Sequence, residues 1–193
     1  MCFMVRKILI VSDSHSKSDN VKIAIDREKS DMLIHLGDIE DDPEKIRVWL
    51  DDAARQYNSG LEGSADLEKK ISLPVPAVFI KGNCDTYGSR DLKKKAVFEL
   101  NNHRFYCTHG HTEGVNYGLQ NLVYSAMEND CDIALYGHTH VSLDDSFEGY
   151  GDIGEGVRIL NPGSISLPRD GKKSYMVMTF NEDGEYTVEL KTL

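Results

Sequence analysis

Two histidines with one residue between them, His138 and His140, stand directly after an apolar run at residues 133–136. A run of this kind is typical of a buried strand, so both histidines would lie at its carboxyl end. In extended backbone, residues i and i+2 point to the same side with about 7 Å between their Cα atoms, which suits one imidazole on each of two metal ions about 3.5–4 Å apart. Gly137 removes a Cβ where such ions would approach the backbone. Taken alone, a His-x-His pair more often lies on one face of a strand than binds two metal ions. The metal-binding interpretation is favoured here because similar clusters occur upstream.

Four upstream clusters of polar residues repeat this arrangement, because each of them follows an apolar, strand-like run. The runs occupy residues 7–11, 32–36, 76–80 and 104–108. The clusters that follow them contain Asp13 with His15, then Asp38, then Asn83 with Asp85, then His109 with His111. Any single cluster could simply cap a helix or form a turn. Their common position favours a shared site, since α/β proteins place sites outside the carboxyl ends of their strands.

Seven of these side chains can offer an oxygen or a nitrogen to a metal ion: Asp13, His15, Asp38, Asn83, His109, His138 and His140. Carboxylate, amide and imidazole ligands without a thiolate suit Mn²⁺, Fe²⁺, Ni²⁺, Co²⁺ or Zn²⁺. Seven ligands are too many for one such ion, but they suit two ions that share one carboxylate. The sequence therefore predicts a site for two divalent ions, and Mn²⁺ is the ion we expect first.

Helical patterns separate the first strand-like runs. We expect a short helix over residues 21–28, with Asp19 or Asn20 as its cap. A longer helix begins at residues 41–43, where two aspartates precede a proline in the first turn. A third helix is expected over residues 117–129. Alternation of strands and helices predicts a fold of the α/β class.

The last third of the chain is nearly all β in its pattern. Further strands are expected over residues 141–146, 157–160, 174–180 and 186–190, and a hairpin joins residues 96–100 to 104–108. Two packed sheets flanked by helices account for both parts of the chain. Residues 59–72 form a surface excursion with one helical turn in this interpretation, and His35 inside the second run is a core histidine.

The composition is that of one soluble globular domain over residues 1–193, with 40% hydrophobic and 28% charged residues. The net charge of −10 disfavours a long DNA or RNA partner, because an acidic surface repels the phosphate backbone. No apolar run approaches the roughly 20 residues of a membrane span, and charged residues interrupt any signal-peptide core. We therefore expect a cytoplasmic protein. Its scattered cysteines are expected to be reduced thiols: Cys2, Cys84, Cys107 and Cys131.

The order of the polar motifs resembles that of the calcineurin-like metallophosphoesterase superfamily. The motifs are Asp13-x-His15, Gly37-Asp38, Gly82-Asn83-x-Asp85, His109-Gly110 and Gly137-His138-x-His140. The resemblance covers residues 7–167, and the forms of residues 82–85 and 161–164 are most similar to the compact prokaryotic subgroup of YfcE-type phosphodiesterases. It implies a four-layer α/β/β/α sandwich of two mixed β-sheets flanked by helices, with a dinuclear phosphoesterase site.

The resemblance also implies how the ligands divide between two ions. One ion would be held by Asp13, His15, Asp38 and His140, and the other by Asp38, Asn83, His109 and His138. Asp38 would bridge the ions. Two divalent cations against two carboxylates leave a positive pocket for a phosphate, and a water between them loses its proton near neutral pH. The resulting hydroxide would attack phosphorus in line, with the ions stabilising the developing charge.

Cys84 is the one departure from the pattern of this superfamily. Many members carry a histidine there that contacts the phosphate and protonates the leaving group. A thiol is a poor substitute for that acid, and we interpret Cys84 as a small filler. His111 could contact the phosphate or donate the proton instead, or it could only support the neighbouring ligands. We expect Asp85 to orient a ligand rather than to bind metal.

We therefore predict a metal-dependent phosphodiesterase or phosphatase that hydrolyses a small phosphorylated molecule by attack of a metal-bridging hydroxide. The alternative is a non-catalytic scaffold or protein-interaction module that retains the fold, as one subunit of the retromer coat does. Loss of ligands would mark such a scaffold, whereas all seven positions hold competent residues here. We expect no membrane association, and the sequence leaves a homo-oligomer open.

Overall fold

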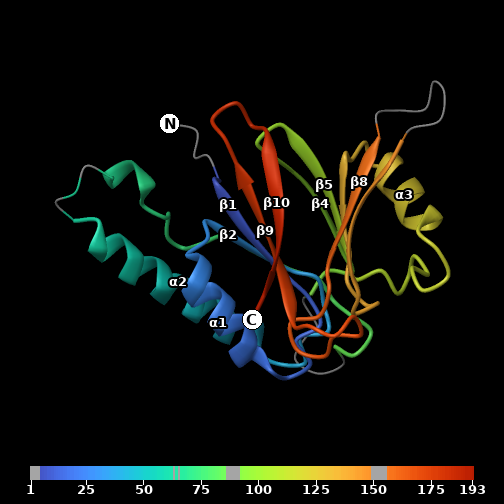
Figure 1. The fold of residues 1–193 in the computed structure, drawn as a ribbon, viewed down its shortest axis with the longest axis horizontal. Helices are drawn as coiled ribbons and strands as arrows, with labels where there is room; N and C mark the ends of the chain where they lie inside the picture. Colours follow the sequence, from blue (N-terminus) through green and yellow to red (C-terminus); the bar gives the residue numbers. More distant parts are fainter. Residues whose placement is uncertain (1–4, 63, 65, 86–91, 149–155) are drawn as a thin grey trace.

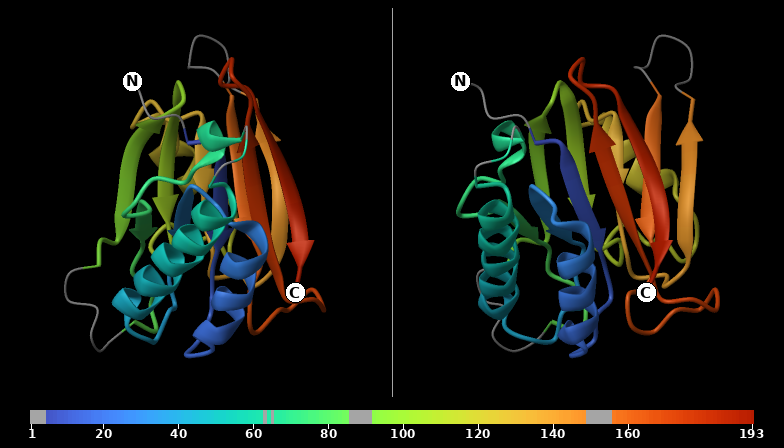
Figure 2. Two further views of the ribbon diagram at one scale, coloured as in Figure 1. Left: turned by 90° about the vertical axis from the view of Figure 1, so that its left-hand side faces the viewer. Right: turned by 60° about the vertical axis from the view of Figure 1, so that its left-hand side comes forward.

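A computed structural model describes residues 5–62, 64, 66–85, 92–148 and 156–193. These residues form two five-stranded sheets packed face to face, with helices on the two outer faces (Figures 1 and 2). The layers are therefore helix, sheet, sheet and helix, and the predicted four-layer α/β/β/α sandwich is confirmed. None of the helices among the described residues is long and apolar enough to cross a membrane.

The first sheet has the strand order β10-β9-β1-β2-β3. Its parallel part consists of β1 (Lys7–Val11), β2 (Met32–His35) and β3 (Ala77–Phe79). Its antiparallel part is the terminal hairpin of β9 (Ser174–Phe180) and β10 (Tyr186–Thr192), of which β9 pairs with β1. The sheet is thus mixed, and β1 and β2 are parallel neighbours within it, so their carboxyl ends lie at the same edge.

The second sheet has the strand order β4-β5-β6-β8-β7. Its centre is parallel and contains β5 (His103–Thr108), β6 (Ile133–Leu135) and β8 (Val157–Pro162). The edge strands β4 (Lys95–Leu100) and β7 (Ser142–Phe147) pair antiparallel with their neighbours. The hairpin predicted between β4 and β5 is confirmed.

Three helices cover the two sheets. The helices α1 (Ser18–Glu28) and α2 (Pro43–Gly60) lie on the outer face of the first sheet, and α3 (Gln120–Met127) lies on the outer face of the second (Figure 2). A short 3-10 turn at Leu67–Lys69 follows α2. This turn agrees with the predicted surface excursion, of which residues 63 and 65 lie outside the described part.

Alternate residues of β1 face different layers of the core. Leu9 and Val11 pack with α1 and α2, while Ile8 and Ile10 pack between the sheets against residues such as Phe105. A third cluster of buried residues joins α3 to the outer face of the second sheet. Because both faces of the central strands are covered, these strands read as continuous apolar runs in the sequence.

The helix ends differ from the sequence-based expectation at two places. The prediction of Asp19 or Asn20 as the cap of α1 is wrong, because the helix already begins at Ser18 and Lys17 occupies the cap position without a side-chain cap bond. Helix α3 is shorter than the predicted residues 117–129, since it begins at Gln120, after turns over residues 111–116, and ends at Met127. The start of α2 agrees with the prediction, because the Asp42 side chain accepts a hydrogen bond from the Glu44 backbone at 3.0 Å.

Three cysteines in the described part, Cys84, Cys107 and Cys131, are free thiols. Cys2, for which a reduced thiol is also expected, lies outside the described residues. His35 is fully buried, as predicted for a core residue, and its Nε2 lies 3.1 Å from the Ser14 hydroxyl. Burial lowers the pKa of His35 to about 4, despite the nearby carboxylates, so this imidazole is neutral at physiological pH.

Candidate metal centre

The loops that follow four parallel strands meet at one end of the sandwich (Figure 1). Asp13 follows β1, Asp38 follows β2, His109 follows β5 and His138 follows β6. Each side chain is presented just beyond the carboxyl end of its strand, which is where open α/β sheets build their sites. The packing of the two sheets thus brings together residues more than 100 positions apart in the chain.

A first group of ligand atoms contains Asp13, His15 and His140, with Asp38 beside it. The two imidazole Nε2 atoms of this group lie 3.2 Å apart, and His140 Nε2 lies 3.2 Å from Asp13 Oδ1. His15 Nε2 is 3.9 Å from Asp13 Oδ1 and 3.8 Å from Asp38 Oδ2. Nitrogen and oxygen atoms therefore converge on a common point, as the ligands of one cation do.

A second group of ligand atoms contains Asp38 and His109, again with Asp13 close by. His109 Nε2 lies 3.4 Å from Asp38 Oδ2 and 3.2 Å from the amide oxygen of Asn83. The ring of His138 lies 5.1 Å from the ring of His109, centroid to centroid. Asp38 Oδ2 therefore stands between the two groups, within 4 Å of one histidine from each of them.

Three of the histidine rings are oriented in the same way, because the Nδ1 atom of each lies close to an oxygen atom of the protein. His15 Nδ1 lies 2.8 Å from a Glu40 carboxylate oxygen. His109 Nδ1 and His140 Nδ1 lie 2.7 and 2.6 Å from the backbone carbonyls of residues 36 and 167. A proton held on each Nδ1 leaves each Nε2 lone pair directed into the site, which is how metal-binding histidines are usually oriented.

The backbone is in the left-handed region at five of the expected ligands. The φ angles are 55° at Asp13, 44° at His15, 53° at Asp38, 69° at His138 and 58° at His140. Such conformations cost about 1–3 kcal/mol each in non-glycine residues, and they concentrate at functional sites. The loops thus hold these side chains in directions that regular strands would not allow.

Close backbone approach explains two glycines next to the site. A Cβ on Gly82 would overlap Asp38 Oδ1, and a Cβ on Gly37 would lie 2.7 Å from His109 Nδ1. Gly37 also has a φ of 105°, which favours glycine. Any side chain at either position would displace an expected ligand.

Asp85 lies behind Asp38 and holds its loop. Its carboxylate accepts backbone hydrogen bonds from Asp38 at 2.9 Å, and from Ile39, Glu40 and Gly82 at 2.8 Å. The side chain is buried, and both oxygens are occupied by these donors. The position of Asp85 is therefore that of a residue that orients a ligand.

The buried charges of the site stabilise one another. Burial acts to raise the pKa of Asp13, but the contacts with His140 and His109 outweigh it and hold the pKa below its ordinary value. Burial likewise opposes ionisation of Asp38, yet its contacts with His109 and the Cys84 backbone hold the pKa well below the usual range. Both carboxylates are thus ionised at neutral pH, as metal ligands must be.

The pKa values of the histidines in the site shift in two directions. The Asp13 contact raises the pKa of His140, and Asp38 and Asp13 raise that of His109 against the effect of its burial. Burial and the neighbouring His109 lower the pKa values of His138 and His111. The two histidines whose pKa values are raised, His109 and His140, are thus those that contact the carboxylates.

The residues present fit a divalent metal ion. Within the described part of the chain, Asp13 Oδ1 is buried and accepts no hydrogen bond, although His140 Nε2 lies 3.2 Å away. Buried polar atoms are nearly always hydrogen-bonded, so an ionised oxygen in this position is suited to binding a cation. The donors are carboxylates, imidazoles and an amide, the set expected for borderline divalent ions.

Residues 6–183 match the family model of the calcineurin-like phosphoesterase superfamily domain. The chain belongs to this superfamily. A probable metallophosphoesterase of Bacillus subtilis, YsnB, is 28% identical over 179 residues, which cover 91% of this chain and 85% of that protein. The phosphodiesterase YfcE of Escherichia coli is 26% identical over 188 residues, which cover 91% of this chain and 88% of that protein.

Two solved structures share the fold of this chain. A predicted phosphoesterase of Streptococcus pneumoniae has a TM-score of 0.69 and 29% identity, over 99% of this chain and 91% of that one. Vps29 of Entamoeba histolytica, at 18% identity, has a TM-score of 0.59 over 97% and 99% of the two chains. The latter likeness concerns the fold alone. For this chain, the superfamily indicates a metal-dependent phosphoesterase, and its clusters of ligand atoms agree with that class.

Within this candidate site, Cys84 contributes its backbone rather than its thiol. The Cys84 backbone N–H donates to Asp38 Oδ1 at 2.8 Å. Partial burial and the contact with Asp38 raise the pKa of the thiol to about 12, so the sulfur stays protonated at neutral pH. A thiol with so high a pKa is a poor acid, and no thiolate is available as a ligand.

His111 lies beside the phosphoesterase site without touching the carboxylates. Its ring centroid is 5.4 Å from that of His109 and 6.1 Å from that of His138, and its buried Nδ1 has no hydrogen-bond partner among the described residues. This position is compatible with both interpretations of the sequence, a contact to the substrate and a support for the ligands.

Two residues of this phosphoesterase site could not be found from the sequence. Glu40 contacts His15 Nδ1, and Asn116 Nδ2 lies 2.9 Å from His138 Nε2. Asn116 stands in a loop with positive-φ glycines at 110, 114 and 118, and this glycine spacing is the only signal that could have marked it. Nothing in the sequence distinguished Glu40, because it is one of several acidic residues between β2 and α2.

Proposed function

We propose that this chain is a dinuclear metal-dependent phosphodiesterase that hydrolyses a small phosphorylated molecule. The observation that carries the proposal is the place of Asp38. Its Oδ2 lies 3.8 Å from His15 Nε2 in one group of ligand atoms and 3.4 Å from His109 Nε2 in the other. A carboxylate shared in this way is what two neighbouring cations require.

Each ion would have its own set of ligands. Asp13, His15, Asp38 and His140 would hold one ion, and Asp38, Asn83, His109 and His138 would hold the other. Divalent ions bound there would supply positive charge for the phosphate and a water that ionises near neutral pH. We expect Mn²⁺ first, with Ni²⁺, Fe²⁺, Co²⁺ and Zn²⁺ as alternatives, because the ligands are oxygen and nitrogen atoms without a thiolate.

The chain's own residues hold and orient these ligands. Asp85 fixes the loop of Asp38 through four backbone hydrogen bonds, and Glu40 keeps the His15 proton on Nδ1. The Cys84 thiol, with a pKa of about 12, gives little help in protonating a leaving group. His111 is the nearest remaining imidazole for that role. We therefore expect good leaving groups to react much faster than poor ones.

The physical properties of the chain favour a small substrate over a macromolecule. The net charge of −10 opposes the approach of long nucleic acids. A phosphate can still bind, because bound cations reverse the sign of the local charge. We propose a cytoplasmic location and a single catalytic domain, and a homo-oligomer is compatible with both.

A non-catalytic scaffold with the same fold is the alternative function. The likeness to Vps29 of Entamoeba histolytica, at 18% identity, concerns the fold and is compatible with this alternative. A scaffold needs no ligand set, whereas this chain keeps ligand atoms within hydrogen-bond distance of one another and a strained backbone that directs them. The enzyme therefore accounts for more of the site.

The test is reconstitution of metal-stripped protein with Mn²⁺, Ni²⁺, Fe²⁺, Co²⁺ and Zn²⁺ in turn, crossed with phosphomonoesters and phosphodiesters. We expect two ions per chain by elemental analysis, hydrolysis of an aryl phosphodiester, and loss of both on chelation. The matched control is Asp144→Asn, which changes a carboxylate paired with Arg158 outside the site and should keep both ions. One ion or none, together with no hydrolysis of any ester, would refute the proposal.

A further inference from the structure

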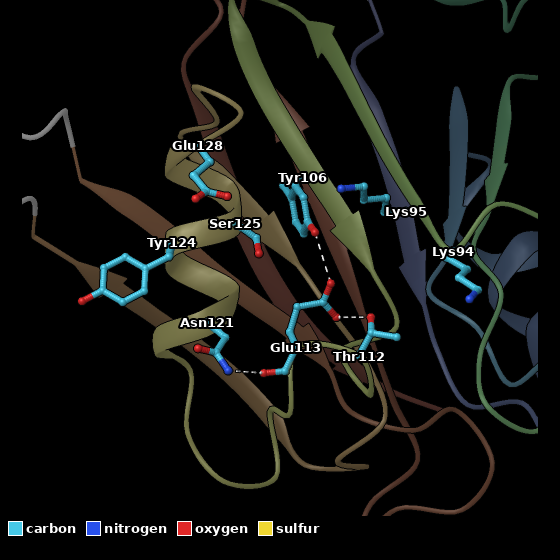
Figure 3. Close-up of a pocket in the computed structure, with 9 residues that line it drawn as sticks. All are labelled: Lys94, Lys95, Tyr106, Thr112, Glu113, Asn121, Tyr124, Ser125 and Glu128. Carbon is cyan, nitrogen blue, oxygen red and sulfur yellow. Dashed lines mark hydrogen bonds between the residues drawn. The ribbon is translucent and has the colours of Figure 1, made fainter.

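A pocket of about 550 Å³ lies outside the set of expected metal ligands. Figure 3 shows its walls, which come from β4, β5, the loop after β5 and helix α3. The lining residues are Lys94, Lys95, Tyr106, Thr112, Glu113, Asn121, Tyr124, Ser125 and Glu128. Pockets of about 300–1,000 Å³ are typical of small-molecule sites.

The pocket adjoins the candidate metal centre through a short segment of chain. The ring of His111 lies 5.4 Å from that of His109, and the next two residues, Thr112 and Glu113, line the pocket. Lys94 is close enough to His111 to act on its pKa, in addition to the larger effects of burial and His109. A substrate with its phosphate at the metals could therefore extend past His111 into the pocket.

The wall next to this segment is rigid and buried. The Glu113 carboxylate accepts hydrogen bonds from Tyr106 at 3.1 Å, Thr108 at 3.0 Å and Thr112 at 2.8 Å. Asn121 on α3 donates to the Glu113 carbonyl at 3.2 Å, as Figure 3 shows. Tyr106 and Glu113 are 1% and 9% exposed. The carboxylate is thus occupied by three hydroxyl groups and holds the loop against β5.

The free charges of the pocket are cationic on its strand side. Residues 93–95 are three consecutive lysines, the densest basic run in a chain of net charge −10. Lys94 and Lys95 are exposed, and within the described part of the chain neither makes an ion pair. The one exposed acidic residue in the lining, Glu128, stands at the opposite, C-terminal end of α3 from Asn121. An unpaired basic pair on an acidic protein favours an anionic ligand.

From these features we infer that the pocket binds the part of the substrate remote from the reacting phosphate, and that this part carries a second anionic group. The inference rests on the proposed function. Lys94 and Lys95 pair with that anion, which is a carboxylate or a second phosphate. Thr112 and Asn121 offer polar contacts to the same substituent. The substrate class is therefore a phosphodiester with an anionic organic substituent.

The experiment compares three phosphodiesters with the same p-nitrophenol leaving group, on the enzyme reconstituted with Mn²⁺. Their second ester group is phenyl, 4-carboxyphenyl or 4-phosphonophenyl. We expect KM to be about tenfold lower for the anionic esters, the effect of two exposed ion pairs. The double variant Lys94→Ala/Lys95→Ala should lose this preference, so that its KM values for the three esters become equal. A preference for only one anionic ester would identify its anion as the carboxylate or the phosphate.

The matched control is Lys172→Ala/Lys173→Ala, which removes the same charge from an exposed basic pair outside the pocket. Equal KM values for the three esters, or an equal loss of preference in the control, would overturn the inference. If no ester is hydrolysed and the chain binds one ion or none, the proposed function fails, and calorimetry with 4-carboxyphenyl phosphate then tests the pocket. Binding about tenfold weaker in the Lys94→Ala/Lys95→Ala variant would support the pocket, and equal binding would refute it.

Discussion

The substitution Asp85→Asn should loosen the loop that carries Asp38. Asp85 is 4% exposed. Its Oδ1 accepts the backbone N–H groups of Ile39 and Glu40, and its Oδ2 accepts those of Asp38 and Gly82, at 2.8–2.9 Å. An asparagine side chain has nearly the same shape but keeps only one of the two oxygens.

The expected loss follows from these four bonds. In either orientation of its amide, asparagine satisfies two backbone donors and turns its own NH₂ group toward the other two. A buried donor left without an acceptor costs about 1–3 kcal/mol, so the unfolding free energy should fall by about 2–6 kcal/mol. Metal affinity should also fall, by about 10–100-fold, because Asp38 is no longer held in place.

Urea unfolding of the metal-free protein, followed by circular dichroism, measures the first effect. The control is Asp52→Asn, whose side chain is 64% exposed beside Arg55, and which should change stability by less than about 0.5 kcal/mol. A loss below about 1 kcal/mol in Asp85→Asn would refute the role of these hydrogen bonds. At saturating Mn²⁺ the variant should regain both ions, and a permanent loss of one ion would make Asp85 a ligand instead.

Four further predictions concern the site and the core. Asp38→Ala should lose both ions in elemental analysis, because it removes the shared carboxylate, and retention of two ions would contradict the bridge. Cys84→Ala should keep both metals and most of the rate. Cys84→His should make the rate depend less steeply on the pKa of the leaving group. An inactive Cys84→Ala enzyme that still binds both metals would show that the thiol is catalytic. His35 has a pKa of about 4 in the folded protein against about 6.5 in the unfolded chain, so it is neutral when folded. The free energy of unfolding should therefore be unaffected by His35 above pH 6.5 and should fall by about 3 kcal/mol as the pH falls toward 4. An NMR titration in which folded His35 is protonated above pH 5.5 would refute this. Duplex and single-stranded DNA should not bind below micromolar concentrations at physiological salt, and tight, salt-sensitive binding would contradict the argument from charge.

The strands and the polar clusters at their ends were predictable because both are local features. An apolar run such as residues 7–11 identifies a strand that is buried on both faces, and the polar residues at 13 and 15 follow it directly in the sequence. The acidic cap and the proline at the start of α2 are likewise contained in a few residues. The order of the motifs was sufficient to indicate the superfamily.

The starts of α1 and α3 were not predictable in the same way. Lys17 gives no cap signal, yet α1 begins directly after it, where the loop after β1 is fixed to the loop after β2 by the hydrogen bond from Ser16 N–H to the Ile39 carbonyl. The turns before α3 depend on Glu113, which is fixed by hydroxyl groups of β5. In each case a contact from another part of the chain overrides the local propensity.

The contacts within the site were decided only by the tertiary structure. The His15 and His140 nitrogens are 125 positions apart in sequence and 3.2 Å apart in space, and Asp85 reaches a loop 45–47 positions earlier. Glu40, Asn116 and the lysine side of the pocket likewise gain their neighbours from packing. Amino-acid types and short spacings determine which chemistry a chain can perform. The positions of ligand atoms, and of the pocket beside them, depend on how two sheets pack, and no short window of sequence contains that information.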